Sequence, residues 1–289
     1  MNKFAIYTAV VGNYDDILQP KVVDSRFDYI LFSTDIELQR IGVWRVRKIN
    51  YSNNDKIKIA RWVKTHPTEL LSKYEFSVWM DANIQIETDY IYNRAIELLN
   101  SGTPISTVVH PQRNCIYKEM FTVYDLGLET EKTTLDWANV LRRNRYPVNN
   151  GLNETNILYR IHSNDIKRFN DFWWSCIERY SRRDQLSFNF ALWKLKMQCE
   201  PLLPQGESAF TSKHFNYISH SNSKRKYYDR STDFSLLRRY YLDLPEKKDE
   251  IRRVYHKIFT LRFPKFWAFV AGQFYRIKFH LSRIITKQQ

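Results

Sequence analysis

Residues 76–83 read Phe76-Ser77-Val78-Trp79-Met80-Asp81-Ala82-Asn83, a mostly apolar run that ends in polar residues. A short apolar run of this kind predicts a strand that is buried on both faces, as in a parallel sheet covered by helices. Ligands of open α/β sheets bind at the carboxyl ends of the strands. Asp81 and Asn83 are therefore candidate binding residues, although an Asp that follows a strand is more often part of a turn or a helix cap.

Strand-like and helix-like segments alternate on both sides of this run. Strands are predicted from β-rich apolar sequence at residues 4–11, 29–32, 43–46, 105–109 and 156–161. Helices are predicted from apolar residues at helical spacing at residues 55–71, 90–99, 135–145, 165–180 and 184–197. This alternation predicts an α/β fold with a mostly parallel sheet flanked by helices.

The composition describes a folded chain with a large positive charge. The 289 residues carry a formal net charge of +14, and 16% of them are aromatic. A chain of this length can bury one substantial core. The charge suits nucleic acid, an anionic membrane surface or a phosphate-bearing substrate. We expect no nucleic-acid partner, because the basic residues do not interleave with an RRM, KH or OB pattern.

Much of the excess charge lies after Ser219. Beyond Pro264, apolar residues recur at helical spacing, and lysines and arginines occupy much of the remaining surface. This pattern predicts a basic amphipathic helical tail that binds an anionic membrane surface through residues 257–289. The alternative is a helix docked on the rest of the chain or on a second subunit. We divide the chain into a domain of residues 1–242 and a basic helical extension of residues 243–289.

The cysteines and the amino terminus indicate the compartment. Cys115, Cys176 and Cys199 are widely spaced, odd in number and without metal-ligand spacing, so we interpret them as reduced thiols. The amino terminus lacks the pattern of a signal peptide, and no stretch approaches the roughly 18 apolar residues of a spanning helix. We expect a cytoplasmic protein that is peripheral at the inner membrane.

A second polar cluster, Arg183-Asp184-Gln185, precedes a predicted helix. Asp184 either caps this helix, with Arg183 exposed, or binds a sugar hydroxyl or acts as a general base, with Arg183 adjusting its pKa. The local sequence leaves both interpretations open.

Four stretches resemble the plant and bacterial glycosyltransferase-like family that includes the mucilage-related and turgor-regulation proteins of plants. They are residues 7–15, residues 64–67 followed by 74–81, residues 157–162, and Trp173-Trp174 followed by 183–188. The resemblance covers roughly residues 4–220 and not the tail. It implies a GT-A-like fold and the transfer of a sugar, of hexosyl type, from a nucleotide-diphosphate donor, which we expect to be a UDP-sugar.

The resemblance also implies where the donor binds. The residues expected to bind the nucleotide donor are Thr8, Val10, Gly12, Tyr14, Asp35, Arg61, Lys64, Asp81, Ala82 and Asn83. Arg61 and Lys64 share a helix face, where they either reach the diphosphate or remain exposed cations. Asp81 and Asn83 occupy the position of the metal motif for Mn²⁺ or Mg²⁺, with His220 as a third ligand or a plain surface histidine. Asn83 departs from the usual motif, because a neutral amide is a weaker ligand than a carboxylate.

The remaining candidate residues are those expected to act in catalysis and those expected to bind the acceptor or the sugar of the donor. Asp81, Arg183 and Asp184 are the expected catalytic residues. The acceptor-side candidates are His110, Arg113, Arg160, His162 and Gln185. His110 and Arg113 follow a strand and should open towards the same cleft, and Arg160 and His162 share one face of a strand. Core or hydrogen-bonding roles are the more common alternative for such histidines.

The predicted function is sugar transfer to a glycan or lipid-linked glycan acceptor in bacterial surface polysaccharide synthesis. One alternative is a nucleotide-sugar pyrophosphorylase, which also uses a nucleotide-binding α/β sheet. Its glycine-rich phosphate loop is missing here, because Gly12 stands alone after the first strand. The other alternative is a non-enzymatic basic protein that binds a membrane or RNA.

Overall fold

A computed structural model of the chain describes residues 3–12 and 15–218. Tyr14, His220, the extension of residues 243–289 and the tail helix expected within it lie outside the described residues. The described residues belong to two compact units. The first runs to Glu119 and resumes at Asn149, and the second is Met120–Val148.

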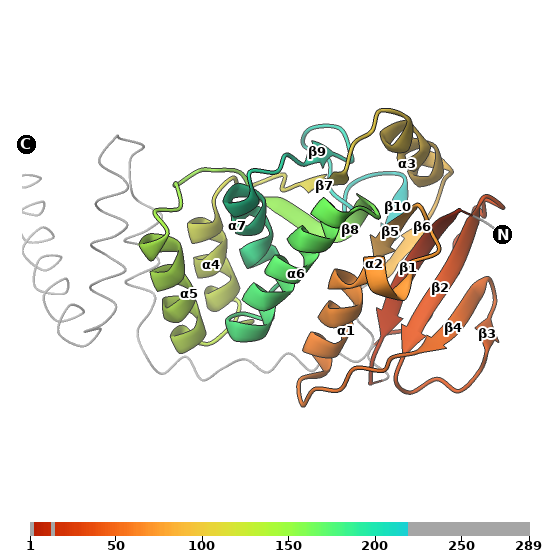
Figure 1. Ribbon diagram of the computed structural model, residues 1–289, viewed down its shortest axis with the longest axis horizontal. Coiled ribbons are helices and arrows are strands. Elements are labelled where there is room, and N and C mark those ends of the chain that lie inside the picture. The colour runs from red at the N-terminus through yellow and green to blue at the C-terminus, as the bar shows by residue number, and fades with distance from the viewer. Residues whose placement is uncertain (1–2, 13–14, 219–289) are drawn as a thin grey trace, which may run out of the picture. The chain divides into compact units, whose positions relative to one another are not determined.

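The first unit is built on an eight-stranded sheet (Figure 1). In spatial order its strands are β3 (Arg40–Ile41), β4 (Trp44–Lys48), β2 (Phe27–Ser33), β1 (Phe4–Val10), β5 (Phe76–Met80), β8 (Asn153–Ile161), β7 (Ile105–Val109) and β9 (Glu200–Pro201). β3 is antiparallel to β4, and β8 is antiparallel to both β5 and β7. The other neighbours pair in parallel, so the sheet is mostly parallel, as the sequence predicts.

Alternate residues of the central strands enter two separate cores, because successive side chains of a strand point to opposite faces. On one face, Tyr7 of β1, Trp79 of β5 and Leu158 of β8 are buried together. The helices over this core are α1 (Lys56–Thr65), α6 (Asn164–Arg179) and α7 (Gln185–Leu195). Phe169 and Trp173 of α6 pack into it at the four-residue spacing of an amphipathic helix.

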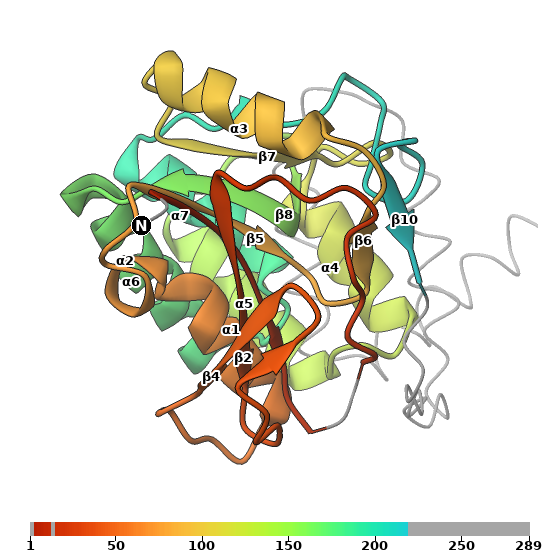
Figure 2. The same ribbon diagram turned by 90° about the vertical axis from the view of Figure 1, so that its right-hand side faces the viewer.

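On the opposite face, Ile6 of β1, Val78 of β5 and Tyr159 of β8 form the second core. This core is covered by α3 (Tyr90–Asn100) and by the antiparallel pair of β6 (Ile84–Ile86) and β10 (Phe215–Tyr217). Figure 2 shows α3 on one side of the sheet, with α1 and α6 on the other. The sheet is therefore flanked by helices on both faces.

The helix predicted over residues 55–71 is in fact two helices. α1 ends at Thr65, and α2 (Pro67–Leu70) begins at Pro67. Proline lacks a backbone N–H and disfavours the helical conformation in the residue before it, so the helix cannot continue through His66. α1 begins after Asp55, whose carboxylate accepts a hydrogen bond from the Ile57 N–H at 3.0 Å.

The other predicted elements match the observed ones to within a few residues, including α5 (Glu131–Arg143). The strands β3, β6, β9 and β10 were not predicted, because two or three residues are too few to show a period. The helix α4 (Ile116–Asp125) was not predicted either. Within the described part of the chain, no helix is both long enough and apolar enough to cross a membrane.

Candidate active site

The carboxyl ends of β1, β2 and β5 lie at one edge of the sheet, because the three strands pair in parallel. Gly12 follows β1, Asp35 follows β2 and Asp81 follows β5. The Gly12 N–H donates a hydrogen bond to the Asp35 carboxylate. The Asp81 N–H donates to the Asn156 carbonyl of β8 at 2.8 Å. The structure therefore brings three of the predicted donor residues to the same edge.

Two neighbouring elements place hydrogen-bond donors and positive charge next to the Asp81 carboxylate. The Trp79 indole N–H donates to Asp81 Oδ1 at 2.7 Å. Lys64 Nζ lies 3.5 Å from the same oxygen, and Arg61 Nη1 lies 3.6 Å from it. The Asp81 side chain is 27% exposed, so it remains accessible to a ligand.

Asp184 lies deeper in the same cluster, directly before α7. Its Oδ2 accepts hydrogen bonds from Lys64 Nζ at 2.5 Å and from the Thr155 hydroxyl at 2.9 Å. Its Oδ1 lies 3.2 Å from Arg61 Nε. The side chain makes no capping hydrogen bond to α7, although Asp184 occupies the N-cap position. Asp184 is thus the buried counterion of two cations on α1.

Lys64 and Asp184 form a buried ion pair, with side chains that are 0% and 6% exposed. Burial lowers the pKa of the Lys64 ammonium, and the charges of Asp184 and Asp81 oppose that shift. Burial alone would raise the pKa of Asp184, but Arg61 and Lys64 hold it well below its usual range. Two cations and two carboxylates therefore balance one another, which offsets the cost of removing Lys64 from water.

Arg160 fixes α1 against the sheet. Its guanidinium is fully buried and donates to the Tyr7 hydroxyl at 2.5 Å, to the Lys64 carbonyl at 2.6 Å and to Asn170 Oδ1 at 2.6 Å. The Tyr7 hydroxyl donates to the same Lys64 carbonyl at 2.9 Å, and burial raises the pKa of Tyr7 to about 12. Arg160 thus supports the backbone of Lys64 from the core and does not face the candidate site.

His162 lies at the other end of β5 from Asp81. Its Nε2 lies 2.8 Å from the Ser77 hydroxyl, and its backbone N–H donates to the Glu75 carbonyl at 2.9 Å. The cause is the direction of β8, because a residue that follows an antiparallel strand lies where its neighbour begins. The structure therefore does not bring His162 to the edge where an acceptor was expected.

His110 and Arg113 follow β7 and lie at the same edge as Asp81. Arg113 Nε donates to Glu119 Oε2 at 2.5 Å, and Arg113 Nη2 lies 3.0 Å from His110 Nε2. Burial and the charge of Arg113 lower the pKa of His110 to about 4. His110 is therefore neutral at physiological pH and suited to hydrogen bonding rather than to charge stabilisation.

Arg183 and Gln185 flank Asp184 and are half-buried. Burial lowers the pKa of Arg183, and its charge interacts with Arg61 and with the carboxylates of Asp184 and Asp81. Arg183 therefore belongs to the charged cluster and is not the freely exposed residue that a simple helix cap would leave.

The start of β8 adds a carboxyl that no motif indicated. Glu154 is 7% exposed, and Asn156 Nδ2 donates to its Oε2 at 3.3 Å. Burial raises the pKa of Glu154 to about 7, and the charge of Glu119 acts in the same direction. The available sequence signal was the polar run of residues 153–156, which forms the start of this strand.

Thr8 and Val10 lie on the face of β1 that α3 covers. They line a narrow recess at the carboxyl edge, together with Ile17, Leu18, Trp44, Met80, Asp81, Ala82 and Gln85. The recess is mostly apolar and adjoins Asp81, and its volume of about 10 Å³ is roughly that of one water molecule.

Lys56 is a second residue that no motif indicated. A Cβ atom at Gly12 would lie 2.7 Å from Lys56 Nζ, so the lysine passes directly over this glycine. Gly12 also has a φ of +74°, which side-chain-bearing residues rarely adopt. The turn after β1 thus needs glycine for two reasons, and a further cation, Lys56, lies directly against it.

Among the described residues, the side chains around Asp81 do not fit a divalent ion. Asp81 Oδ1 already accepts a hydrogen bond from Trp79 and lies next to two cations. Asn83 is 6% exposed. Among residues 3–12 and 15–218, no group of three or more His, Cys, Asp or Glu side chains is placed to hold a metal ion. An ion at Asp81 would therefore meet positive charge instead of the oxygen ligands that Mg²⁺ and Mn²⁺ require.

Comparison with protein families matches residues 1–206 to the TOD1/MUCI70, glycosyltransferase-like domain. The matched range contains all eight strands of the large sheet and the charged cluster around Asp81 and Asp184. It confirms the family resemblance of the four sequence stretches. A search of curated proteins gave no match.

Proposed function

The chain belongs to the TOD1/MUCI70 glycosyltransferase-like family, and we propose that it transfers a sugar from a UDP-sugar to a glycan or lipid-linked glycan acceptor in bacterial surface polysaccharide synthesis. The observation that carries this proposal is the charged cluster of Arg61, Lys64, Asp81 and Asp184. It places cations at the carboxyl edge of an α/β sheet, where such folds bind nucleotides. The family match favours a transferase over a pyrophosphorylase.

Arg61 is the cation of the cluster that meets the donor diphosphate. Its side chain is 16% exposed, whereas that of Lys64 is 0% exposed. As the acceptor hydroxyl attacks C1 of the sugar, the bond from C1 to the diphosphate oxygen breaks and negative charge grows on the leaving group. A guanidinium held in place beforehand stabilises that charge through charge-assisted hydrogen bonds.

Lys64 and Asp184 are positioning residues in this proposal. Lys64 is buried and Asp184 accepts donors at both oxygens, so neither contacts the substrate directly. Together they fix Arg61 and Asp81 in one orientation. Since its pKa is held below the usual range, Asp184 is a poor acceptor for the proton of a sugar hydroxyl.

Glu154 is better suited to accept that proton. Its pKa of about 7 matches the pH at which a general base works most efficiently. It lies at the carboxyl edge and is hydrogen-bonded to Asn156, whose carbonyl accepts from the Asp81 N–H. We assign Glu154 this role on its position and its proton affinity.

Replacing Glu154 by glutamine should change how stability depends on pH. The pKa of Glu154 rises from 4.5 to about 7 on folding, so its stabilising effect is complete below about pH 4.5 and is lost as the pH rises through 7. Relative to Glu154→Gln, the wild type should lose on the order of 3 kcal/mol between pH 4.5 and 8. Urea unfolding at several pH values measures this difference.

The same variant should lower the rate of sugar transfer by roughly 10²- to 10⁴-fold and remove its rise through pH 7. Glu178→Gln, at an exposed position of α6, is the control and should change neither property. Unfolding curves that shift with pH equally in the wild type and Glu154→Gln contradict the assigned proton affinity, and an unchanged rate contradicts the catalytic role.

A thermal-shift screen of nucleoside diphosphates tests donor binding. The donor nucleotide at a hundred times its Kd should stabilise the chain by about 2.7 kcal/mol, which raises Tm by roughly 5 °C. UDP should give the largest shift, and Arg61→Met should abolish it, because it removes the guanidinium that meets the diphosphate. If no nucleoside diphosphate raises Tm, the proposed donor site is wrong.

The screen is repeated with Mn²⁺ and with EDTA. We expect the shift with UDP to be the same in both, because Arg61 and Lys64 supply the positive charge at Asp81. A shift that appears only with Mn²⁺ would reject this assignment and leave the donor site itself intact.

A further inference from the structure

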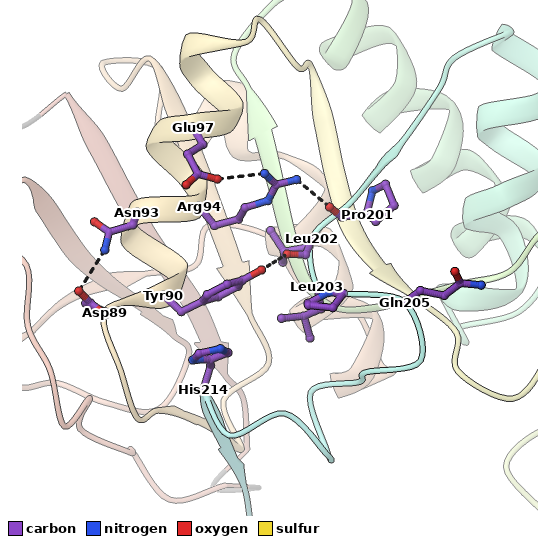
Figure 3. A pocket seen from close by; sticks show the side chains of 11 residues that line it. Asp89, Tyr90, Asn93, Arg94, Glu97, Pro201, Leu202, Leu203, Gln205 and His214 are labelled. Carbon is purple, nitrogen blue, oxygen red and sulfur yellow. Dashed lines mark hydrogen bonds and ion pairs between the residues drawn. The ribbon is translucent and has the colours of Figure 1, made fainter.

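A recess on the α3 side of the sheet has no role in the proposed reaction (Figure 3). It lies between α3, the segment after β9 and the residue before β10, and its volume of about 520 Å³ is in the range of small-molecule sites. Figure 3 shows Tyr90 projecting from α3 towards Leu202 and Arg94 projecting towards Pro201, with His214 below Tyr90.

The centre of the recess is a fixed aromatic pair. The rings of Tyr90 and His214 stack with centroids 4.2 Å apart and planes 13° apart. The Tyr90 hydroxyl donates to the Leu202 carbonyl at 3.0 Å, and His214 Nδ1 lies 2.8 Å from the Thr88 hydroxyl. Both rings are half-exposed. A rigid aromatic face costs little conformational entropy on binding and packs well against the C–H face of a pyranose ring.

Planar polar groups surround this pair. The Arg94 guanidinium is held by Glu97 at 3.1 Å and by the Pro201 carbonyl at 3.1 Å. The Asn93 amide donates to Asp89 at 3.0 Å. Gln205 also lines the recess. Amide, guanidinium and carboxylate groups present donors and acceptors in one plane, which matches the adjacent hydroxyls of a sugar.

The charge of the recess separates it from the donor site. Its lining has two carboxylates, Asp89 and Glu97, and one guanidinium, Arg94. This excess of negative charge disfavours a diphosphate or another anion, whereas the cluster at Asp81 presents cations at the sheet edge. A nucleotide therefore suits the Asp81 edge, and a neutral ligand suits the recess.

The backbone connects the recess to the candidate active site. β6 leads from Asn83 towards Asp89, six residues on, so the two lie at most about 20 Å apart. The Glu87 N–H donates to the His214 carbonyl at 2.9 Å, and the Ile218 N–H donates to the Asn83 carbonyl at 2.9 Å. An oligosaccharide can span this distance.

We propose that the recess binds an uncharged sugar unit of the glycan acceptor, at a distance from the unit that receives the new sugar. That this glycan is the acceptor of the reaction rests on the proposed function. That the recess binds a neutral glycan does not depend on the proposed function. This subsite selects for acceptors longer than a monosaccharide, because only a chain reaches both places.

Saturation-transfer NMR on the full chain tests the subsite. The probes are purified neutral tetra- to hexasaccharides of glucose, mannose, galactose, xylose or rhamnose. We expect at least one to bind and Tyr90→Ala to weaken that binding about tenfold. The UDP thermal shift should stay unchanged in this variant. Tyr217→Ala, at an exposed tyrosine outside the recess, is the matched control and should bind as the wild type does.

Each outcome decides the inference. Binding by none of these oligosaccharides, equal binding by Tyr90→Ala, or stronger binding of anionic oligosaccharides overturns it. His214→Ala, which removes the other ring of the stacked pair, should also weaken binding and provides the test if Tyr90→Ala does not fold. If UDP gives no thermal shift while Tyr90-dependent glycan binding persists, the proposed transferase function fails and the subsite stands.

Discussion

Lys64→Met should lower the free energy of unfolding by about 3–5 kcal/mol. The variant removes the closest partner of Asp184, at 2.5 Å, and leaves a carboxylate with a 6% exposed side chain to Arg61 and the Thr155 hydroxyl. An uncompensated charge in the core is expensive, because no water replaces the lost partner. Urea unfolding monitored by tryptophan fluorescence measures the change.

Lys167→Met is the matched control for this prediction. Lys167 also contacts two carboxylates, Glu69 at 2.7 Å and Asp171 at 3.1 Å, but its side chain is 43% exposed. We expect a loss of no more than about 1 kcal/mol, because water screens a surface pair. The double variant Lys64→Met/Asp184→Asn should recover part of the loss, since it leaves no unpaired carboxylate at position 184. Equal losses for Lys64→Met and Lys167→Met would show that the buried pair does not stabilise the fold.

Arg61→Met should lower the turnover of the donor by roughly 10²- to 10³-fold. The substitution removes the guanidinium that meets the leaving diphosphate and retains an apolar side chain of similar length. Release of UDP from UDP-sugars measures turnover. Because Arg61 also lies 3.2 Å from Asp184, the assay is run at a temperature where the variant is folded, as checked by circular dichroism.

Arg61→Lys and Arg168→Met complete this series. Arg61→Lys keeps the charge but loses the paired N–H donors, so it should recover only part of the turnover. Arg168→Met removes an arginine of α6 whose side chain is 71% exposed, and it should turn over as the wild type does. Turnover within about threefold of wild type in a folded Arg61→Met variant would remove Arg61 from the reaction.

The sequence indicates the fold through local patterns. The apolar run of residues 76–80 predicts β5, and helical spacing of apolar residues predicts α6. The break between α1 and α2 was also visible in the sequence, because Pro67 marks it, and the helix predicted across it was too long. The short strands could not be predicted in this way. Their pairing depends on distant partners, as β10 depends on β6.

The candidate site was only partly visible in the sequence. Asp81 was placed at a strand end by local pattern, and Arg61 and Lys64 by their spacing on one helix. The neighbouring residues in the sequence did not determine whether the side chains of Arg61 and Lys64 contact a ligand or are buried in the core. The packing of α1 makes Lys64 fully buried and leaves Arg61 partly exposed, although both lie on the same helix face.

The sequence by itself determined the order of most of the longer strands and helices and the polar residues that follow those strands, because both depend on neighbouring residues. The tertiary structure alone decided which charges meet. Lys64 and Asp184 are 120 positions apart, and the antiparallel direction of β8 moves His162 away from Asp81 while bringing Glu154 towards it. The proton affinities of Asp184 and Glu154 follow from these contacts, because burial and the nearest charges set a pKa and neither is encoded in adjacent residues.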